Sequence, residues 1–140
     1  MIILGLDLGG KRIGVAKTDA LGMMAHPFGI LERKSDEKTS GEILELVRKH
    51  QVGRVVVGLP KNMDGSSGKA AQDALSFGEM LKKKLTGVDL VYWDERLSTC
   101  AVERAMSDAG ISTRDQRKKV DALAAQWILQ GYMTSLGKSE

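Results

Sequence analysis

The stretch that decides the fold is Ile2-Ile3-Leu4-Gly5-Leu6-Asp7-Leu8-Gly9-Gly10. It is apolar except for Asp7 and its glycines, which predicts a strand covered on both faces at the centre of a sheet. Side chains alternate along a strand, so Asp7 shares a face with Gly5 and Gly9. A buried carboxylate needs a partner, and the missing side chains leave open space that suits a cation or a phosphate. The alternative is that Asp7 only hydrogen-bonds the backbone of its own turn.

Two more strands are expected close behind the first. The turn Gly9–Arg12 leads into the apolar stretch Ile13–Ala16, which predicts a β-hairpin. A third strand is expected over Met23–Leu31. Because Pro27 within it cannot donate to a ladder, this strand should lie at the edge of the sheet.

The rest of the chain alternates helices with strands. The pattern predicts buried strands over 54–60 and 88–93, and helices over 39–50, 67–85, 100–109 and 118–133. Residues Ile111–Lys119 are polar and basic, and the segment 112–119 is expected to be a mobile loop. Helical crossovers make the last two strands parallel to a neighbour. We therefore expect one α/β domain over residues 1–140.

Composition excludes several classes of protein. Only 4% of the 140 residues are aromatic, so platforms on which bases could stack are sparse. The net charge of +3 is compatible with a polyanionic partner. The single Cys100 excludes an internal disulfide and a multi-cysteine metal site. No stretch reads as a membrane span or a secretory signal, so we expect a cytoplasmic protein with no membrane partner.

Acidic residues converge in the expected sheet. Functional sites of open α/β sheets lie outside the carboxyl ends of the parallel strands, where Asp7 and the pair Asp94-Glu95 stand. Only one member of that pair can point toward Asp7, and the strand periodicity leaves open which. A third acid, Asp121, lies on the last helix, at the margin of an expected buried stripe of Val120, Leu123, Ala124, Trp127 and Ile128. Three carboxylates form the hard-oxygen set that Mg²⁺ or Mn²⁺ prefers, and two such ions can promote phosphodiester cleavage.

Four ordered motifs carry a family resemblance. They are Asp7-x-Gly9, Val57-Gly58-Leu59-Pro60-x-Asn62-Met63-Asp64-Gly65, Asp94-Glu95-Arg96-Leu97-Ser98-Thr99 and Val120-Asp121-x-x-Ala124-Ala125. Together they span nearly the whole chain and resemble the YqgF family, also called RuvX, of Holliday junction resolvases and pre-16S rRNA nucleases. The resemblance implies a ribonuclease H-like fold. In that fold a five-stranded mixed sheet has three antiparallel and then two parallel strands, in the order 3-2-1-4-5, with helices on both faces.

The resemblance also implies an activity and a site. It implies a bacterial nuclease that uses Mg²⁺ or Mn²⁺, with two ions expected, on structured nucleic acid. By motif, the catalytic and metal-binding acids are Asp7, Glu95 (preferred over Asp94) and Asp121. The favoured role is trimming the 5′ end of the pre-16S rRNA, with ribosomal precursor particles as partners and a monomer or weak dimer as the working state. Nucleic-acid contacts are expected from Lys11, Arg12, Lys61, Arg96, Arg114, Arg117 and Lys118.

Three other functions stay open. Branched DNA is the alternative substrate, as for a Holliday junction resolvase. The hairpin Asp7–Ala16 also resembles the first phosphate-binding hairpin of the sugar kinase, chaperone and actin ATPases, but those need two such domains, and no glycine-rich adenosine motif follows. A non-catalytic nucleic-acid-binding module is the last alternative. Acids at three separated strand and helix ends argue against it, because phosphate binding favours basic side chains.

Overall fold

The computed structural model describes the backbone of residues 1–61, 64–95 and 114–137, and the side chains of these residues except 114–121 and 137. The helix expected over 100–109 lies outside them. No helix in these ranges is long and apolar enough to cross a bilayer. In chain order the elements are β1 (Ile2–Leu8), β2 (Arg12–Thr18), β3 (Ala25–Glu32), α1 (Asp36–Lys49), β4 (Val52–Leu59), α2 (Lys69–Lys84), β5 (Asp89–Asp94) and α4 (Arg114–Gly137).

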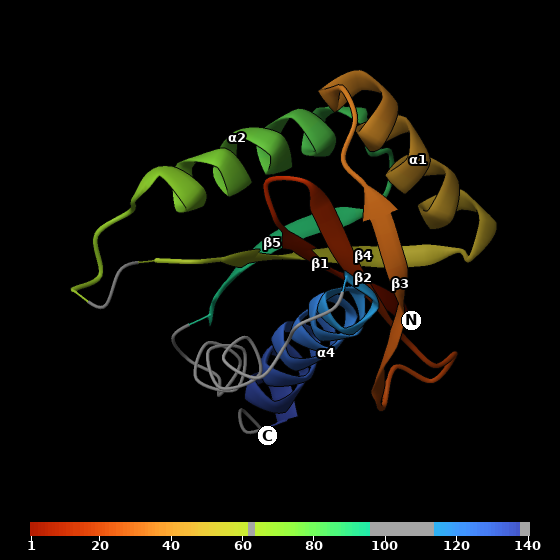
Figure 1. The fold of residues 1–140 in the computed structure, drawn as a ribbon. Helices are drawn as coiled ribbons and strands as arrows, with labels where there is room; N and C mark the ends of the chain where they lie inside the picture. The colour runs from red at the N-terminus through yellow and green to blue at the C-terminus, as the bar shows by residue number, and fades with distance from the viewer. Residues whose placement is uncertain (62–63, 96–113, 138–140) are drawn as a thin grey trace.

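The five strands form one mixed sheet in the order β3-β2-β1-β4-β5. β2 is antiparallel to β1 and to β3, whereas β4 is parallel to β1 and to β5. The predicted order 3-2-1-4-5 is therefore confirmed, and so is the edge position of β3 with its Pro27. α1 and α2 cover one face of the sheet and α4 covers the other (Figure 1), which confirms helices on both faces.

Each face of the sheet has its own apolar core. On the face of α1 and α2, side chains of β1, β2, β4 and β5 pack with the buried residues Ile43, Val47, Ala74, Phe77 and Leu81. On the other face, Ile3 and Val56 pack with the α4 residues Ala124, Ala125, Ile128 and Leu129. Alternation along β1 therefore decides which helix layer each of its residues meets, and Asp7 belongs to the α4 face together with Ile3.

Glycines bring backbones together at the site end of β1. A Cβ atom on Gly5 would stand 2.8 Å from Cβ of Leu129 and 3.3 Å from the carbonyl oxygen of Ala125. A Cβ atom on Gly9 would stand 2.7 Å from the carbonyl oxygen of Arg12. The open space that we expected beside Asp7 at these two glycines is therefore filled, by α4 in one case and by the following turn in the other. The expectation was wrong because a missing side chain in a packed interior lets a neighbour approach.

The last helix differs from its prediction in two ways. α4 begins at Arg114, so residues 114–117 are helical where a loop was expected, and the helix starts four residues before the predicted Lys118. Arginine, glutamine and lysine are good helix formers, and no glycine or proline interrupts this stretch. The buried row is also rotated: Leu123 is 36% exposed, whereas Ala125 and Leu129 are fully buried. α4 is rotated about its axis because Gly5 has no side chain, so Ala125 and Leu129 can pack directly against β1.

Candidate active site

Two buried acids stand at the carboxyl ends of parallel strands. Asp7 is the second-last residue of β1, and Glu95 follows directly after β5, with β4 between these strands. Among the acidic side chains that the structure describes, only these two are buried, with 7% and 5% exposed. The register pairs Leu6 with Val57 and Gly58 with Trp93, so Gly58 lies on the strand between the two acids.

Both acids belong to the face of the sheet that α4 covers. Asp7 lies two residues after Gly5 and so on the same face of β1, and at Gly5 the helix α4 occupies the place of the missing side chain. A Cβ atom on Gly58 would meet Cδ1 of Ile128 on α4 at 2.6 Å and Oε1 of Glu95 at 3.2 Å. The geometry thus puts Glu95 on the face of Asp7, which the strand periodicity had left open.

Asp94 belongs to the opposite face. It alternates with Glu95 and shares its side of β5 with Tyr92, which packs with the core under α1 and α2. The hydroxyl of Tyr92 donates to Glu79 of α2 at 2.7 Å. Burial, together with the acceptor Glu79, raises the pKa of Tyr92 far above its usual value, so this hydroxyl stays protonated. Asp94 therefore offers a control that is adjacent in sequence and directed to another layer.

The donor set fits a hard divalent cation. Carboxylate oxygens are the ligands that Mg²⁺ and Mn²⁺ prefer, and Oε1 of Glu95 lies 3.2 Å from where a Cβ atom on Gly58 would stand, so a side chain at position 58 would crowd it. Within the described side chains, no group of three His, Cys, Asp or Glu residues comes together as a metal site. The side chain of Asp121 is not among them. Its backbone lies in α4, one turn before Ala125, which contacts β1.

The turn between β1 and β2, which begins two residues after Asp7, forms a shallow hollow. Its lining is Gly9, Gly10, Lys11 and Arg12, and its volume is about 260 Å³. The N–H of Gly9 donates to the carbonyl oxygen of Arg12 at 2.9 Å and closes the turn. Lys11 is exposed and Arg12 is half-buried. A concave turn that carries two cations is suited to hold a phosphate group.

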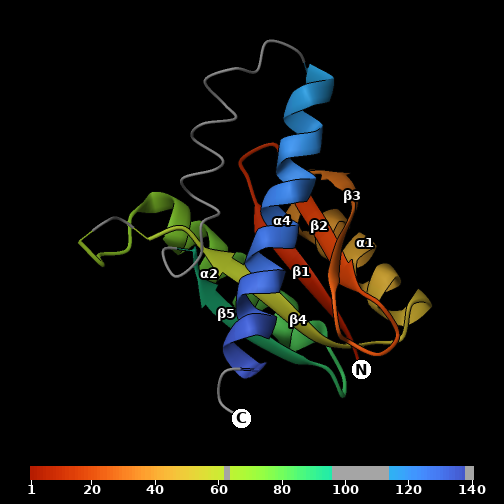
Figure 2. The same cartoon turned by 90° about the horizontal axis from the view of Figure 1, so that it is seen from below.

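The other basic residues of the predicted set lie in three places. Lys61 follows β4 at the same edge, and its N–H donates to the carbonyl oxygen of Leu59 at 3.0 Å. Arg96 lies outside the described residues. Arg114, Arg117 and Lys118 form the first turns of α4, which project beyond the β1–β2 turn (Figure 2); their side chains are not described. Positions 114, 117, 118 and 121 follow the three- and four-residue spacing of one helix face.

The ion pair of Arg33 and Asp73 links the β1–β2 turn to α2, and the sequence analysis did not predict it. Nη1 of Arg33 donates to the carbonyl oxygen of Gly9 at 2.8 Å and to Oδ2 of Asp73 at 2.7 Å, and Nη2 donates to Oδ1 of Asp73 at 2.9 Å. These hydrogen bonds lower the pKa of Asp73 and raise that of Arg33. The partners lie 24 and 40 residues away in the chain, so no local pattern announces them.

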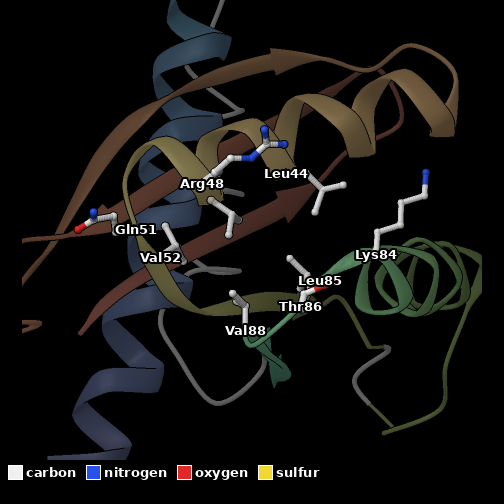
Figure 3. A pocket seen from close by; sticks show the side chains of 9 residues that line it. Leu44, Arg48, Gln51, Val52, Lys84, Leu85, Thr86 and Val88 are labelled. Atoms are coloured by element: carbon white, nitrogen blue, oxygen red, sulfur yellow. The ribbon is translucent and has the colours of Figure 1, made fainter.

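A second hollow lies away from the acids. It has a volume of about 350 Å³ and opens between the ends of α1 and α2 and the starts of β4 and β5 (Figure 3). Its lining is Leu44, Val47, Arg48, Gln51, Val52, Lys84, Leu85, Thr86 and Val88. These residues include no carboxylate, and they stand at the end of the parallel strands opposite to Asp7 and Glu95. This hollow is therefore not the candidate active site.

A known protein family and curated proteins match this chain over nearly its whole length. A sequence model of the RuvX family, described as "Holliday junction resolvase", matches residues 1–135. The chain belongs to the RuvX family. It is 42% identical to a "Putative pre-16S rRNA nuclease" of Agathobacter rectalis, over 99% of both chains. It is 43% identical to a protein of the same name from Clostridium acetobutylicum, over 97% of this chain and 100% of the relative.

Solved structures show the same fold as this RuvX chain at low identity. The RuvC protein of Thermus thermophilus in complex with a Holliday junction substrate is 13% identical, with a TM-score of 0.61 over 98% of this chain and 96% of the other. A fowlpox virus resolvase with Holliday junction DNA is 12% identical, with a TM-score of 0.57 over 97% and 99%. The predicted ribonuclease H-like fold is thereby confirmed.

Proposed function

We propose that this RuvX chain is a cytoplasmic, divalent-metal-dependent nuclease that matures the 5′ end of pre-16S rRNA on ribosomal precursor particles. Relatives at 42–43% identity over nearly the whole chain carry the name pre-16S rRNA nuclease, which supports the substrate. The observation that carries the proposal is the pair of buried carboxylates on either side of Gly58. Two carboxylates at one end of the sheet are the type of ligand that Mg²⁺ and Mn²⁺ prefer, so a divalent cation would bind there.

Each predicted residue has a role in this proposal. Asp7, Glu95 and Asp121 would hold the metal, with Asp121 reaching the sheet edge from α4. When bound, a pair of Mg²⁺ or Mn²⁺ ions activates water and stabilises the leaving oxygen of a phosphodiester. Lys11 and Arg12 bind the phosphate that enters the hollow of the β1–β2 turn. The remaining basic residues at this edge, Lys61, Arg96, Arg114, Arg117 and Lys118, hold the flanking phosphates over the acids, which would otherwise repel them.

A second candidate substrate is four-way DNA. The matched family model is described as a Holliday junction resolvase, and resolvases in complex with junction DNA share this fold. A resolvase that cuts two strands symmetrically acts as a two-fold dimer, whereas rRNA trimming is compatible with a monomer or weak dimer. Sedimentation of the protein with each substrate therefore accompanies the assay below.

A cleavage assay tests the proposal. Purified protein with Mg²⁺ or Mn²⁺ is given an RNA fragment that spans the 5′ end of 16S rRNA and its precursor sequence, or a four-way DNA junction of equal charge. Asp7→Asn and Glu95→Gln are expected to lower cleavage by more than about a hundredfold, because even outer-shell partners of a metal contribute about 10- to 100-fold. Asp94→Asn is the matched control and should retain cleavage. Undiminished cleavage by Asp7→Asn would refute the site, and exclusive cleavage of the junction would refute the rRNA substrate.

A further inference from the structure

Arg33 joins three segments that are distant in the chain. It follows β3 directly, and its backbone N–H donates to the carbonyl oxygen of Lys11 at 2.8 Å. Its guanidinium donates to the carbonyl oxygen of Gly9, also at 2.8 Å. The same residue therefore holds both sides of the β1–β2 turn, once through its backbone and once through its side chain.

The guanidinium is itself held in place. Asp73 of α2 accepts two parallel hydrogen bonds from it, at 2.7 and 2.9 Å, in the fork geometry that only arginine offers. The guanidinium carbon lies 5.4 Å from the ring centre of Phe77, one turn further along α2. The side chain of Arg33 is only 11% exposed. An arginine fixed in this way is a rigid link between α2 and the turn.

The position of this turn matters for the proposed site. Gly9 comes two residues after Asp7, and Lys11 and Arg12 line the hollow that takes a phosphate. A charge-assisted hydrogen bond to phosphate forms only at contact distance, and a misplacement of about 1 Å can reduce a rate about a hundredfold. The contact between Arg33 and Gly9 is thus placed where it controls both the end of the acid-bearing strand and the two cations.

We propose that Arg33 is a positioning residue of the nuclease: anchored by Asp73, it fixes the Gly9–Arg12 turn so that Lys11 and Arg12 meet the substrate phosphate next to Asp7. The inference rests on the proposed function for the identity of the ligand, which is a phosphate group of the nucleic acid. Arg33 itself does not touch the substrate. It acts through the carbonyl oxygen of Gly9.

Amide hydrogen exchange tests the positioning without any substrate. Arg33→Lys keeps the charge, but one ammonium cannot form the fork to Asp73 and reach Gly9 in the same geometry. The amides of Gly9 and Arg12 should then exchange about tenfold faster or more, because local opening sets their exchange rate. The control is Glu42→Gln, which removes only the surface ion pair with Lys34. Exchange in Arg33→Lys equal to that of the wild type would overturn the proposal.

A double-mutant cycle tests the functional part. Binding of the precursor rRNA fragment is measured without divalent cation for the wild type, Lys11→Ala, Arg33→Lys and the double variant. If Arg33 places Lys11, then Lys11→Ala weakens binding in the wild type but has little further effect in Arg33→Lys, whereas a purely structural arginine gives independent effects. Independent effects, or no effect of Lys11→Ala in the wild type, would overturn the proposal.

A second, milder variant keeps the proposal testable if Arg33→Lys does not fold. Asp73→Asn keeps the bond between Arg33 and Gly9 but weakens its anchor, so it should show the same changes at smaller size. If Arg33→Lys does not fold, Asp73→Asn decides: faster exchange at Gly9 supports the proposal, and unchanged exchange overturns it. The proposed nuclease function is refuted by a different result, namely retained cleavage in Asp7→Asn. The positioning role of Arg33 and the nuclease function can therefore be refuted independently.

Discussion

Oε1 of Glu95 lies 3.2 Å from the point where the Cβ atom of an alanine at position 58 would stand. This distance is shorter than an ordinary van der Waals contact, so the buried carboxylate occupies its place because β4 carries no side chain there. Cδ1 of Ile128 fills the same space from α4, at 2.6 Å from that point. Gly58 is therefore where β4, α4 and the acid after β5 meet.

The first prediction separates the two roles of Gly58. Gly58→Ala should destabilise the fold by about 1–3 kcal/mol, as overpacking does, and should also lower cleavage. Adding Ile128→Val removes the Cδ1 atom and should restore part of the stability without restoring cleavage, because the methyl group still crowds Glu95. Urea unfolding and the cleavage assay measure the two effects. Recovery of both properties in the double variant would show that Glu95 is not disturbed.

The second prediction concerns the approach of α4 to β1. Gly5→Ala places a Cβ atom 2.8 Å from Cβ of Leu129, so strand and helix must separate, at about 1–3 kcal/mol. Gly41→Ala in α1 meets nothing within 4 Å and should instead stabilise the protein by about 0.5–1 kcal/mol through helix propensity. Denaturation midpoints of the two variants should move in opposite directions. If both midpoints moved equally and in the same direction, strand β1 and helix α4 would accommodate the added methyl group at position 5 without cost.

The third prediction concerns metal removal. In EDTA, Asp7→Asn should leave the free energy of unfolding unchanged or raise it, because the change removes a buried charge near Glu95. With Mn²⁺, the wild type should gain thermal stability as the ion concentration rises above its dissociation constant, whereas Asp7→Asn should gain little. Melting curves over a Mn²⁺ series measure this. Equal gains in both proteins would place the ion elsewhere.

The fourth prediction follows from the hydrogen bonds that Arg33 donates to Asp73. They hold the pKa of Asp73 below its ordinary 3.8, so the folded state favours the ionised form. This stability is present above pH 3.8 and is lost as pH falls through the lowered pKa. Asp73→Asn should therefore be less stable than the wild type near neutral pH, and the difference should vanish in strong acid. Because the carboxylate is 45% exposed, we expect at most about 1 kcal/mol. A difference that does not change with pH would contradict this origin.

The order of the strands could be predicted because local signals agreed. The apolar run of β1 required a central position, Pro27 required an edge, and helical crossovers required parallel pairing. The start of α1 was placed at Thr39, but Ser35 accepts the N–H of Lys38 at 3.2 Å and the helix begins at Asp36. Ser35 is therefore the N-cap of α1, but it stands in a segment of polar residues that resembles a loop, so the sequence did not single it out.

The site was predictable only in part, because its geometry depends on contacts between distant segments. Alternation predicted that one of two neighbouring acids lies on the face of Asp7, but only the closeness of Glu95 to Gly58, on the face that α4 covers, shows which. The link from Arg33 to Asp73 and Gly9 has no periodicity and no motif. Its residues come together only when β3, α2 and the β1–β2 turn meet in the folded chain.

The last prediction concerns the first turns of α4. Arg114, Arg117 and Lys118 share one helix face with position 121, in turns that project beyond the β1–β2 turn (Figure 2). Replacing all three with Ala should weaken binding of the precursor rRNA fragment. It should also flatten the salt dependence by about 0.7 to 0.9 units of log–log slope for each lost phosphate contact. Turnover at saturating substrate should change far less, because these residues hold the strand without touching the reacting phosphate.

The matched control removes three other cations, Lys49, Lys82 and Lys83, which are exposed in the last turns of α1 and α2. Both triple variants change the formal net charge from +3 to 0 (3 − 3 = 0), so any effect of overall charge on association is the same for both. Only the α4 variant should show the flattened slope, since only its positions lie in the helix turns that project beyond the β1–β2 turn. Equal loss in both variants would mean that the α4 residues act through net charge alone, and would remove them from the proposed interface.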